Sequence, residues 1–254
     1  MNYVMVGGNT KWSKILIKNF EQKKFKLKFT SSRYIKKKNN FTNYKKIPLN
    51  NIDFVVLCSD AKRNINAAKF FDKKKMPIFI EKPISNSFIN YVNFKKKSNS
   101  KSIYFCNYLH IYSDPIKLLK KKINKQNILS IKLIFGKNGK ERTINSSYEW
   151  LPHPLSVLFF LKNNNYNASE VNYTNFKNKK KTNIKIQYKK KNFNILIQSG
   201  NNFKSTKYIV EIITKKNNYF YDGTDPRKLK INEKIIYFKN MPLMNSINIF
   251  SKNY

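Results

Sequence analysis

The first half of the chain alternates short apolar runs with segments whose apolar residues repeat at helical spacing. Continuous apolar runs are typical of strands that are buried on both faces of a parallel sheet, and strands separated by helices imply crossover connections. We therefore expect an α/β domain with a parallel sheet. Its strands are expected at residues 2–6, 25–29, 52–58, 78–80 and 102–109. Helices are expected to start near Trp12, after Ala61, after Ser85 and at Asp114, and Asp114 is the expected N-cap of the last of these helices.

The second half, from Ile128 on, changes to short runs in which apolar residues alternate with Lys or Asn. This alternation is typical of a half-buried antiparallel sheet. One helical pattern interrupts it, beginning near Pro152. The expected strands are Ile131–Phe135, Ile184–Tyr188, Phe193–Gln198, Tyr208–Thr214, Tyr219–Tyr221 and Ile235–Phe238. We predict a Rossmann-like domain over residues 1–115 and an α+β domain, built on a mostly antiparallel sheet, over residues 116–254.

The composition indicates a globular protein without a membrane segment. Hydrophobic residues make up 41% of the 254 residues, which is typical of a chain with a packed core. No apolar run approaches the roughly 18 residues that a membrane span needs, and the N-terminus shows no signal-peptide pattern. Cys58 and Cys106 lie in apolar runs, which predicts reduced and buried thiols. These features together predict a cytoplasmic protein.

The net charge of +39 raises the possibility of a nucleic-acid partner. Only four of the 52 basic residues are arginine, however, and base readout favours arginine. The lysines are also spread along the whole chain among Asn, Ile, Phe and Tyr. We therefore expect no specific nucleic-acid partner. Polyanion binding is kept as the least favoured functional hypothesis, after the two that are given below.

A glycine turn between the first expected strand and the first helix is the setting in which a helix N-terminus receives a phosphate. The dinucleotide fingerprint G-x-G-x-x-G would follow that strand. The best register here is Gly8-x-Thr10-x-x-Ser13, which keeps one glycine of three. The candidate cofactor-binding residues of this turn are Gly7, Gly8, Asn9, Thr10, Lys11 and Trp12.

The end of the second strand predicts which dinucleotide is preferred. In a Rossmann unit this point meets the adenosine ribose, where an acidic residue selects NAD and an arginine accommodates the 2′-phosphate of NADP. Ser32 and Arg33 stand here and no acidic residue does. The sequence therefore favours NADP(H) over NAD(H). The alternative interpretation is that Ser32 and Arg33 form an ordinary polar turn of a basic protein and bind no cofactor.

The stretch from Pro77 to Ser85 contains the strongest catalytic candidate. An apolar strand ends there in Glu81-Lys82-Pro83, and the carboxyl ends of parallel strands are where open α/β sheets bind ligands. Burial disfavours a charged lysine, so Lys82 could acquire a pKa suited to proton transfer. A surface Glu-Lys pair at a strand end is the alternative interpretation.

Nearly the whole chain resembles the glucose–fructose oxidoreductase/inositol dehydrogenase (Gfo/Idh/MocA) family of NAD(P)-dependent oxidoreductases. The most specific part is Asp53-Phe54-Val55-Val56-Leu57-Cys58-Ser59-Asp60 followed by Ile78-Phe79-Ile80-Glu81-Lys82-Pro83. A second match is Tyr148-Glu149-Trp150-Leu151-Pro152-His153, and a third is Tyr221-Asp222-Gly223.

The resemblance implies roles for individual residues. Lys82 and His153 would be the catalytic acid/base groups and would bind substrate together with Glu149. Independently of the resemblance, His110 is a further substrate-cleft candidate. The candidate cofactor-binding residues beyond the glycine turn are Ser59, Asp60, Glu81 and Lys82, in addition to Ser32 and Arg33 at the end of the second strand. The sequence departs from the family pattern at Asp60, Asn64 and Ser156, where proline, histidine and aspartate are usual.

The first hypothesis is therefore an NADP(H)-dependent oxidoreductase that transfers hydride to or from a carbonyl, hydroxyl or imine carbon of a sugar-like metabolite. The second is a catalytically degenerate binding or assembly subunit of the same fold, suggested by the incomplete glycine fingerprint. No ligand-spaced histidines or cysteines indicate a metal. In the resembled family the large sheet commonly pairs subunits, so a homodimer or homotetramer is expected.

Overall fold

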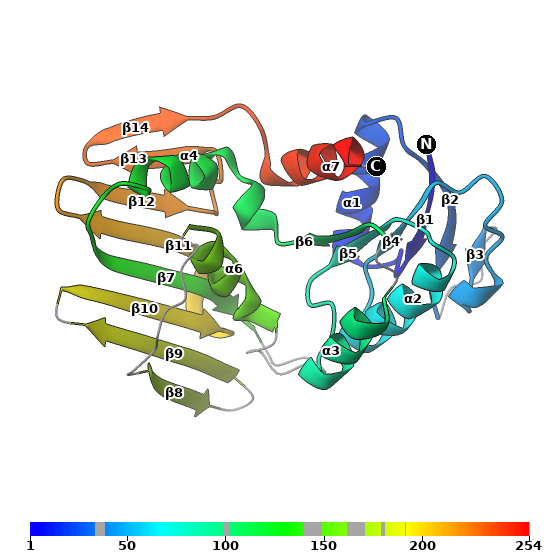
Figure 1. Ribbon diagram of the computed structural model, residues 1–254, viewed down its shortest axis with the longest axis horizontal. Helices are drawn as coiled ribbons and strands as arrows, with labels where there is room; N and C mark the ends of the chain where they lie inside the picture. The colour runs from blue at the N-terminus through cyan, green and yellow to red at the C-terminus, as the bar shows by residue number, and fades with distance from the viewer. Residues whose placement is uncertain are drawn as a thin grey trace. The chain divides into compact units, whose positions relative to one another are not determined.

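The computed structural model describes residues 1–33, 39–98, 102–139, 149–161, 171–178, 181–190 and 192–253. The chain forms two compact units (Figure 1). Unit 1 contains residues Met1–Asn107 and Ser246–Tyr254, and unit 2 contains Tyr108–Asn245. The expected boundary at residues 115–116 falls eight residues beyond this division, inside a helix, and the C-terminal residues belong to unit 1.

Unit 1 is built on a six-stranded sheet whose paired strands all run parallel. The strand order is β3-β2-β1-β4-β5-β6, which is the order of a Rossmann fold. The expected parallel α/β sheet is confirmed. Its strands are β1 (Asn2–Val6), β2 (Lys26–Ser31), β3 (Asn40–Phe41), β4 (Phe54–Leu57), β5 (Ile78–Glu81) and β6 (Tyr104–Asn107).

Successive side chains of a strand point to opposite faces of the sheet. Because β1, β4 and β5 are apolar almost throughout, both faces are apolar, and helices cover both of them. On one face α2 (Ala61–Lys73) and α3 (Phe88–Lys97) contribute Phe71 and Phe94 to a hydrophobic cluster with β1, β4 and β5. On the other face Phe20 of α1 (Lys11–Gln22) and Phe250 of α7 (Pro242–Lys252) pack against Phe54. The continuous apolar runs of the sequence therefore reflect strands buried on both faces.

Unit 2 is built on an eight-stranded sheet of order β14-β13-β12-β11-β7-β10-β9-β8. All neighbours are antiparallel except β7 and β10, which pair in parallel. The expected mostly antiparallel sheet is confirmed. Its strands are β7 (Ile128–Asn138), β8 (Val171–Asn178), β9 (Lys181–Lys190), β10 (Phe193–Gly200), β11 (Asn202–Thr214), β12 (Asn218–Asp222), β13 (Lys228–Ile231) and β14 (Lys234–Tyr237).

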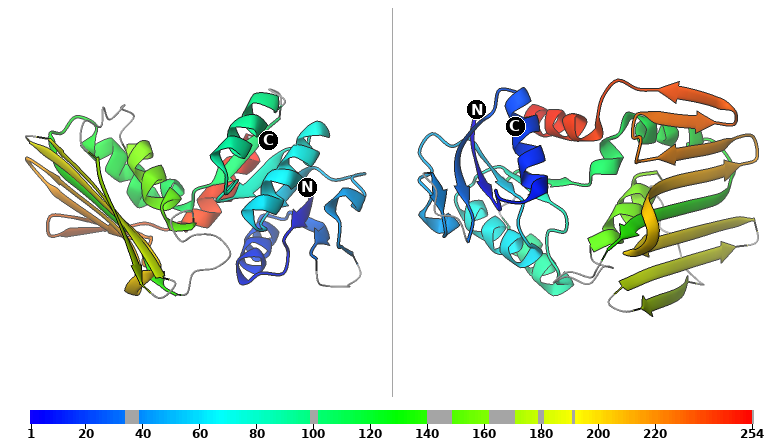
Figure 2. Two further views of the ribbon diagram at one scale, coloured as in Figure 1. Left: turned by 90° about the horizontal axis from the view of Figure 1, so that it is seen from below. Right: turned by 180° about the vertical axis from the view of Figure 1, so that it is seen from behind.

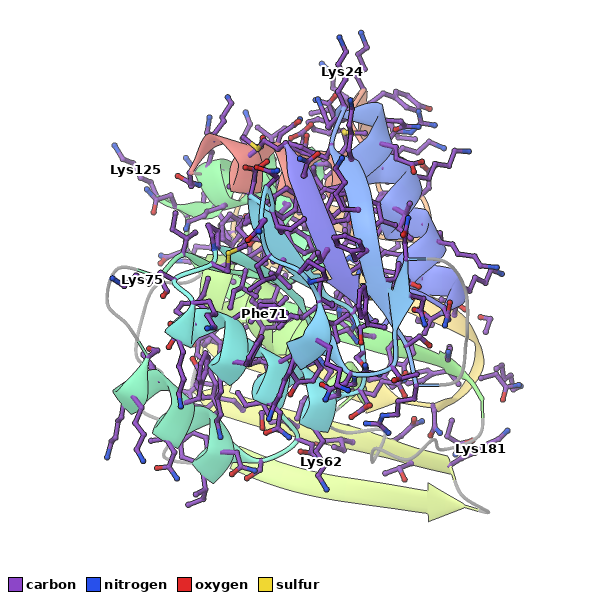
Figure 3. All side chains as sticks on the ribbon, turned by 90° about the vertical axis from the view of Figure 1, so that its right-hand side faces the viewer. Lys24, Lys62, Phe71, Lys75, Lys125 and Lys181 are labelled. Carbon is purple, nitrogen blue, oxygen red and sulfur yellow. The ribbon has the colours of Figure 1, made fainter. Side chains whose placement is uncertain are left out.

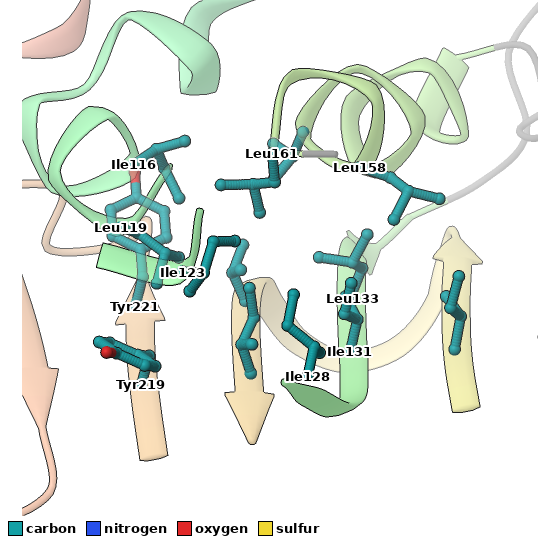
Figure 4. Packing of buried hydrophobic residues seen from close by; sticks show 14 of the residues in the cluster. Ile116, Leu119, Ile123, Ile128, Ile131, Leu133, Leu158, Leu161, Tyr219 and Tyr221 are labelled. Carbon is teal, nitrogen blue, oxygen red and sulfur yellow. The ribbon is translucent and has the colours of Figure 1, made fainter. Parts of the chain in front are cut away.

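Two helices, α4 (Asp114–Ile123) and α6 (Pro152–Leu161), lie on one face of the eight-stranded sheet (Figure 2). Their apolar side chains pack on every second residue of the strands. Ile116, Leu119, Leu158 and Leu161 meet Leu133 and its neighbours in a close-packed layer (Figure 4). Burial of this layer supplies the main stabilisation of unit 2, at roughly 25 cal/mol per Å² of apolar surface.

Several local expectations need correction. The N-cap of α4 is Ser113, whose Oγ accepts the Ile116 N–H, and Asp114 is the first helical residue. Cys58 is buried, but Cys106 is partly accessible, and neither forms a disulfide. Strands β3, β8 and β13 lie in segments where the sequence showed no strand pattern.

The lysines account for the high charge without interrupting either core. Lys24, Lys62 and Lys75 are exposed and point outward from unit 1, as does Lys125 from unit 2 (Figure 3). By contrast, Phe71 is fully buried. None of the described helices combines the length and apolar character that crossing a membrane requires.

Candidate functional site

The turn between β1 and α1 packs directly on the end of β4. Gly7 has a φ of +98°, and a Cβ at this position would lie 2.1 Å from the backbone oxygen of Cys58. The order of the sheet reverses between β1 and β4, which is the switch point where doubly wound folds bind their ligands. Glycine is therefore required here both for the backbone conformation and for the close approach.

The N-terminus of α1 carries a capping box in place of the second and third fingerprint glycines. Thr10 Oγ1 accepts the Ser13 N–H at 3.0 Å, and Ser13 Oγ accepts the Thr10 N–H at 2.8 Å. Four N–H groups at a helix start lack intrahelical partners, so this box occupies two of them. The N–H groups of Lys11 and Trp12 remain as donors at a site where a phosphate is electrostatically favoured.

The end of β2 brings together four of the predicted cofactor residues. Asn9 Nδ2 donates a hydrogen bond to the Oγ of Ser32, which is buried. Arg33 follows Ser32 and forms an exposed ion pair with Asp60, with Nη2 and Oδ2 3.3 Å apart. Asp60 also caps α2, because its Oδ1 accepts the Arg63 N–H at 2.9 Å. Asp60 thus fills the place of the family's proline with a capping residue.

Sequence reasoning did not assign two residues of the first turn of α2. Arg63 is buried, and its Nη2 donates to Ser31 Oγ at 2.7 Å. Asn64 is buried as well, and its Oδ1 accepts the Ser59 N–H at 2.9 Å. Asn64 therefore fixes the turn after β4, where the family pattern has histidine. The only sequence signal for Arg63 is that arginine is rare in this lysine-rich chain.

Glu81 ends β5 and is held by residues from two other elements, β6 and α1. Asn107, its register partner at the end of β6, donates from Nδ2 to Glu81 Oε1 at 2.6 Å, and the side chain of Trp12 also hydrogen-bonds the carboxyl. Burial raises the pKa of Glu81, while these two hydrogen bonds and the charge of Lys82 lower it. A carboxyl is thus enclosed at the carboxyl edge of the sheet beside the turn of Gly7.

The thiol of Cys58 shows that these strand ends converge. Burial raises its pKa to about 12, the carboxylate of Glu81 adds to that rise, and a hydrogen bond with Thr10 lowers it. The β1–α1 turn, the end of β4 and the end of β5 therefore share one electrostatic environment. Lys82 follows Glu81 directly and is half-buried, with a cis peptide bond to Pro83.

In unit 2 the structure brings the two histidines together. His110, in the short 3₁₀ helix Leu109–Tyr112, is buried, and His153 is the second residue of α6. Their ring centroids are 5.3 Å apart with planes at 80°. Tyr208 of β11 packs against His110 at 5.0 Å. His110, which lacked a sequence motif, is therefore the immediate neighbour of the histidine that had one.

Other residues complete this histidine cluster. The ring of Trp150 lies 5.8 Å from that of His153 and has Lys137 Nζ 5.5 Å from its centroid. Burial raises the pKa of Tyr208, and the charge of Glu149 raises it further, which places that carboxylate near the cluster. Tyr148, the first residue of the expected motif, lies outside the described residues.

The predicted site residues thus form one group in each unit. Unit 1 holds the expected cofactor residues with Lys82, and unit 2 holds Glu149, His110 and His153. Their roles stay predictions. Within the ranges that the structure describes, no three His, Cys, Asp or Glu side chains gather as a metal-binding set.

No family model matches the sequence, and no curated protein matches it. Solved structures do match its fold. A Gfo/Idh/MocA family oxidoreductase from Vibrio cholerae matches with a TM-score of 0.77 and 14% identity, covering 100% of this chain and 88% of that one. D-galactose-1-dehydrogenase from Rhizobium etli matches at 0.74 and 16%, covering 99% and 87%.

UDP-N-acetylglucosamine 3-dehydrogenase GnnA from Acidithiobacillus ferrooxidans matches with a TM-score of 0.80 and 10% identity, covering 99% of this chain and 88% of that one. At identities this low the likeness establishes the fold and leaves the activity to be argued from the residues. Both the Rossmann-ordered sheet and the large second sheet are included in these matches, because each covers almost the entire chain. The chain therefore has the fold of the Gfo/Idh/MocA oxidoreductases.

Proposed function

We propose that this protein is an NADP(H)-dependent oxidoreductase that acts on a carbonyl, hydroxyl or imine carbon of a sugar-like metabolite. The observation that carries the proposal is the placement of Glu81 and Lys82. They lie at the carboxyl end of β5, where Glu81 shares the electrostatic environment of the turn after β1 and of the end of β4. Nucleotide cofactors bind at that edge of a doubly wound sheet.

The residues of unit 1 fit a dinucleotide. Gly7 lets the turn pack closely on the end of β4, and the N–H groups of Lys11 and Trp12 would be available to a pyrophosphate at the helix start. Ser32 and Arg33 directly follow β2, the strand whose end meets the adenosine ribose in a Rossmann unit. When bound, the nicotinamide ring would supply or accept the hydride.

Lys82 would orient the substrate hydroxyl or carbonyl oxygen and transfer the proton that accompanies hydride transfer. Its neighbour Glu81 is a buried carboxyl whose pKa is raised by burial and lowered by the charge of Lys82, so the two groups interact. The enclosing hydrogen bonds from Asn107 and Trp12 fix the Glu81 side chain and thereby the backbone that carries Lys82.

His153 would be the second acid/base or substrate-binding group, with Glu149 binding substrate beside it. The contact with His110 and Trp150 restricts the orientation of the His153 ring. The aromatic face of half-buried Tyr208 suits the apolar face of a sugar ring.

The names of two structural neighbours support a sugar-like substrate, since one is a D-galactose-1-dehydrogenase and the other a UDP-N-acetylglucosamine 3-dehydrogenase. We further propose a homodimer or homotetramer, paired through the sheet face of unit 2 opposite to α4 and α6. The proposed compartment is the cytoplasm.

The test is a turnover screen over sugars, keto-sugars and nucleotide sugars with NADPH and NADP, compared among wild type, Lys82→Ala and Lys96→Ala. Lys96 is an exposed lysine of α3 in the same unit, so its removal changes the net charge equally. We expect turnover in wild type and Lys96→Ala and at least about a hundredfold less in Lys82→Ala. Equal turnover in all three would refute the role of Lys82.

A second candidate function is a binding or assembly subunit without turnover. The capping box favours it, because Thr10 and Ser13 already use two of the helix-end donors. This candidate predicts that no dinucleotide binds. Saturable NADPH binding, even without an identified substrate, would exclude it in this form.

A further inference from the structure

Arg63 is a buried cation at the end of β2 that the reaction proposed above does not use. Its side chain is 8% exposed. Its Nη2 donates to Ser31 Oγ at 2.7 Å and to the backbone oxygen of Thr42 at 3.3 Å. The guanidinium carbon lies 5.8 Å from the centre of the Tyr44 ring. A guanidinium has five N–H donors, so the two bonds from Nη2 leave other donors on its fork.

Arg33 approaches the same strand end from the solvent side. It is paired with Asp60 at 3.3 Å, and the other oxygen of Asp60 accepts the backbone N–H of Arg63. Arg33 and Arg63 thus meet the same exposed carboxylate, Arg33 through its guanidinium and Arg63 through its backbone N–H. Burial lowers the pKa of Arg63 and the charge of Arg33 lowers it further, while the charge of Asp60 raises it, as expected for two like charges on either side of one carboxylate.

An additional anion at this point would relieve the repulsion between these like charges. The ion pair of Arg33 with Asp60 is exposed, and exposed pairs contribute little stability, so an incoming phosphate could displace the carboxylate. The planar fork of arginine also matches phosphate geometry better than the lysines that surround it. In a Rossmann unit the group that arrives at the end of the second strand is the 2′-position of the adenosine ribose.

We propose that Arg63 is a second selectivity residue for the 2′-phosphate of NADP(H). Arg63 contacts the phosphate from the buried side of the site, and Arg33 contacts it from the solvent side. The inference rests on the proposed function, because it requires that unit 1 binds a dinucleotide. Asp60 is the internal anion that holds Arg33 until the phosphate arrives.

Arg63 could instead serve only to hold the segment at Thr42 and Tyr44 against β2. The two roles predict different results. A structural role would weaken every nucleotide equally, since all of them need the same strand end. A selectivity role weakens only ligands that carry the 2′-phosphate.

The experiment measures affinities for NADPH, NADH and adenosine 2′,5′-bisphosphate by calorimetry at about 0.3 M salt, in wild type, Arg63→Gln and Asp60→Asn. We expect Arg63→Gln to lose at least about tenfold in affinity for NADPH and the bisphosphate, as for loss of a charged hydrogen bond. Its NADH affinity should change by less than about twofold. Asp60→Asn keeps an N-cap residue and should bind NADPH more tightly relative to NADH.

Each outcome decides a separate question. Equal losses for NADPH and NADH in Arg63→Gln would overturn the inference and leave the proposed function intact. Wild type that binds neither dinucleotide would overturn the proposed function itself, and the inference with it. If Arg63→Gln does not fold, Asp60→Asn decides, because an unchanged preference between NADPH and NADH in that variant overturns the inference.

Discussion

Replacement of Gly7 by alanine tests the close approach of the β1–α1 turn to β4. A Cβ there would meet three backbone atoms, at 2.1 Å (Cys58 O), 2.5 Å (Cys58 C) and 2.8 Å (Ser59 N). Backbone atoms at the end of a central strand cannot rotate away as a side-chain tip can. Alanine at this positive φ costs about 1–3 kcal/mol before any overlap is counted. We expect unit 1 to lose at least about 2 kcal/mol of unfolding free energy.

Gly8→Ala is the matched control. Its Cβ would lie 2.9 Å from Thr30 Cγ2, which is a side-chain atom. The φ of Gly8 is not in the positive range. Overpacking of this kind costs about 1 kcal/mol, so the two variants should differ by at least about 1 kcal/mol.

The assay is urea denaturation followed by Trp12 fluorescence in a Trp150→Phe background. The two tryptophans belong to different units, so the remaining one reports unit 1 alone. An NADPH titration of each variant would then show whether the turn also shapes the cofactor site. If Gly7→Ala unfolds within about 0.5 kcal/mol of Gly8→Ala, the tight packing of this turn on β4 is refuted.

Three further predictions concern single residues. Lys82→Ala should keep NADPH affinity within about twofold and lower turnover at least about a hundredfold, and turnover within about twofold of wild type would remove its catalytic role. Because burial raises the pKa of Glu81, the folded state holds a proton that the unfolded state releases, so stability from this group is lost as pH rises through the folded pKa. Glu81→Gln should therefore gain stability relative to wild type as pH rises above about 4.3, as measured by urea denaturation from pH 4 to 8. If the difference in unfolding free energy between Glu81→Gln and wild type did not depend on pH, the raised pKa would be contradicted. Thr10→Ala should cost about 1 kcal/mol of unfolding free energy through loss of the N-cap, and an unchanged urea midpoint would show that the capping box contributes nothing.

The parallel sheet could be predicted because its signals are local. Each buried strand of unit 1 is a continuous apolar run, and each is followed by a helical pattern, so the order of elements fixes the class of fold. The position of Lys82 at a strand end follows from the same pattern. The alternating runs of unit 2 indicated its sheet in the same way.

What the sequence could not show depends on contacts between distant segments. Arg63 looks like any basic residue of an exposed helix start, and only the packing of α2 beside β2 gives it Ser31 as a partner. The strand β13 is four residues long with two lysines, so its alternation is too short to detect. The contact between His110 and His153 joins residues from two elements whose packing no local pattern encodes.

The most direct test of the proposed function is a titration of the purified protein with NADPH and with NADH at about 0.3 M salt, where nonspecific attraction to the lysines is screened. Saturable binding with NADPH preferred is the predicted result, and it would support the roles of Gly7, Arg33 and the helix start. Preference for NADH would keep the oxidoreductase and remove the role of Arg33. Absence of binding for both cofactors would contradict the proposal that this protein is a dinucleotide-dependent enzyme.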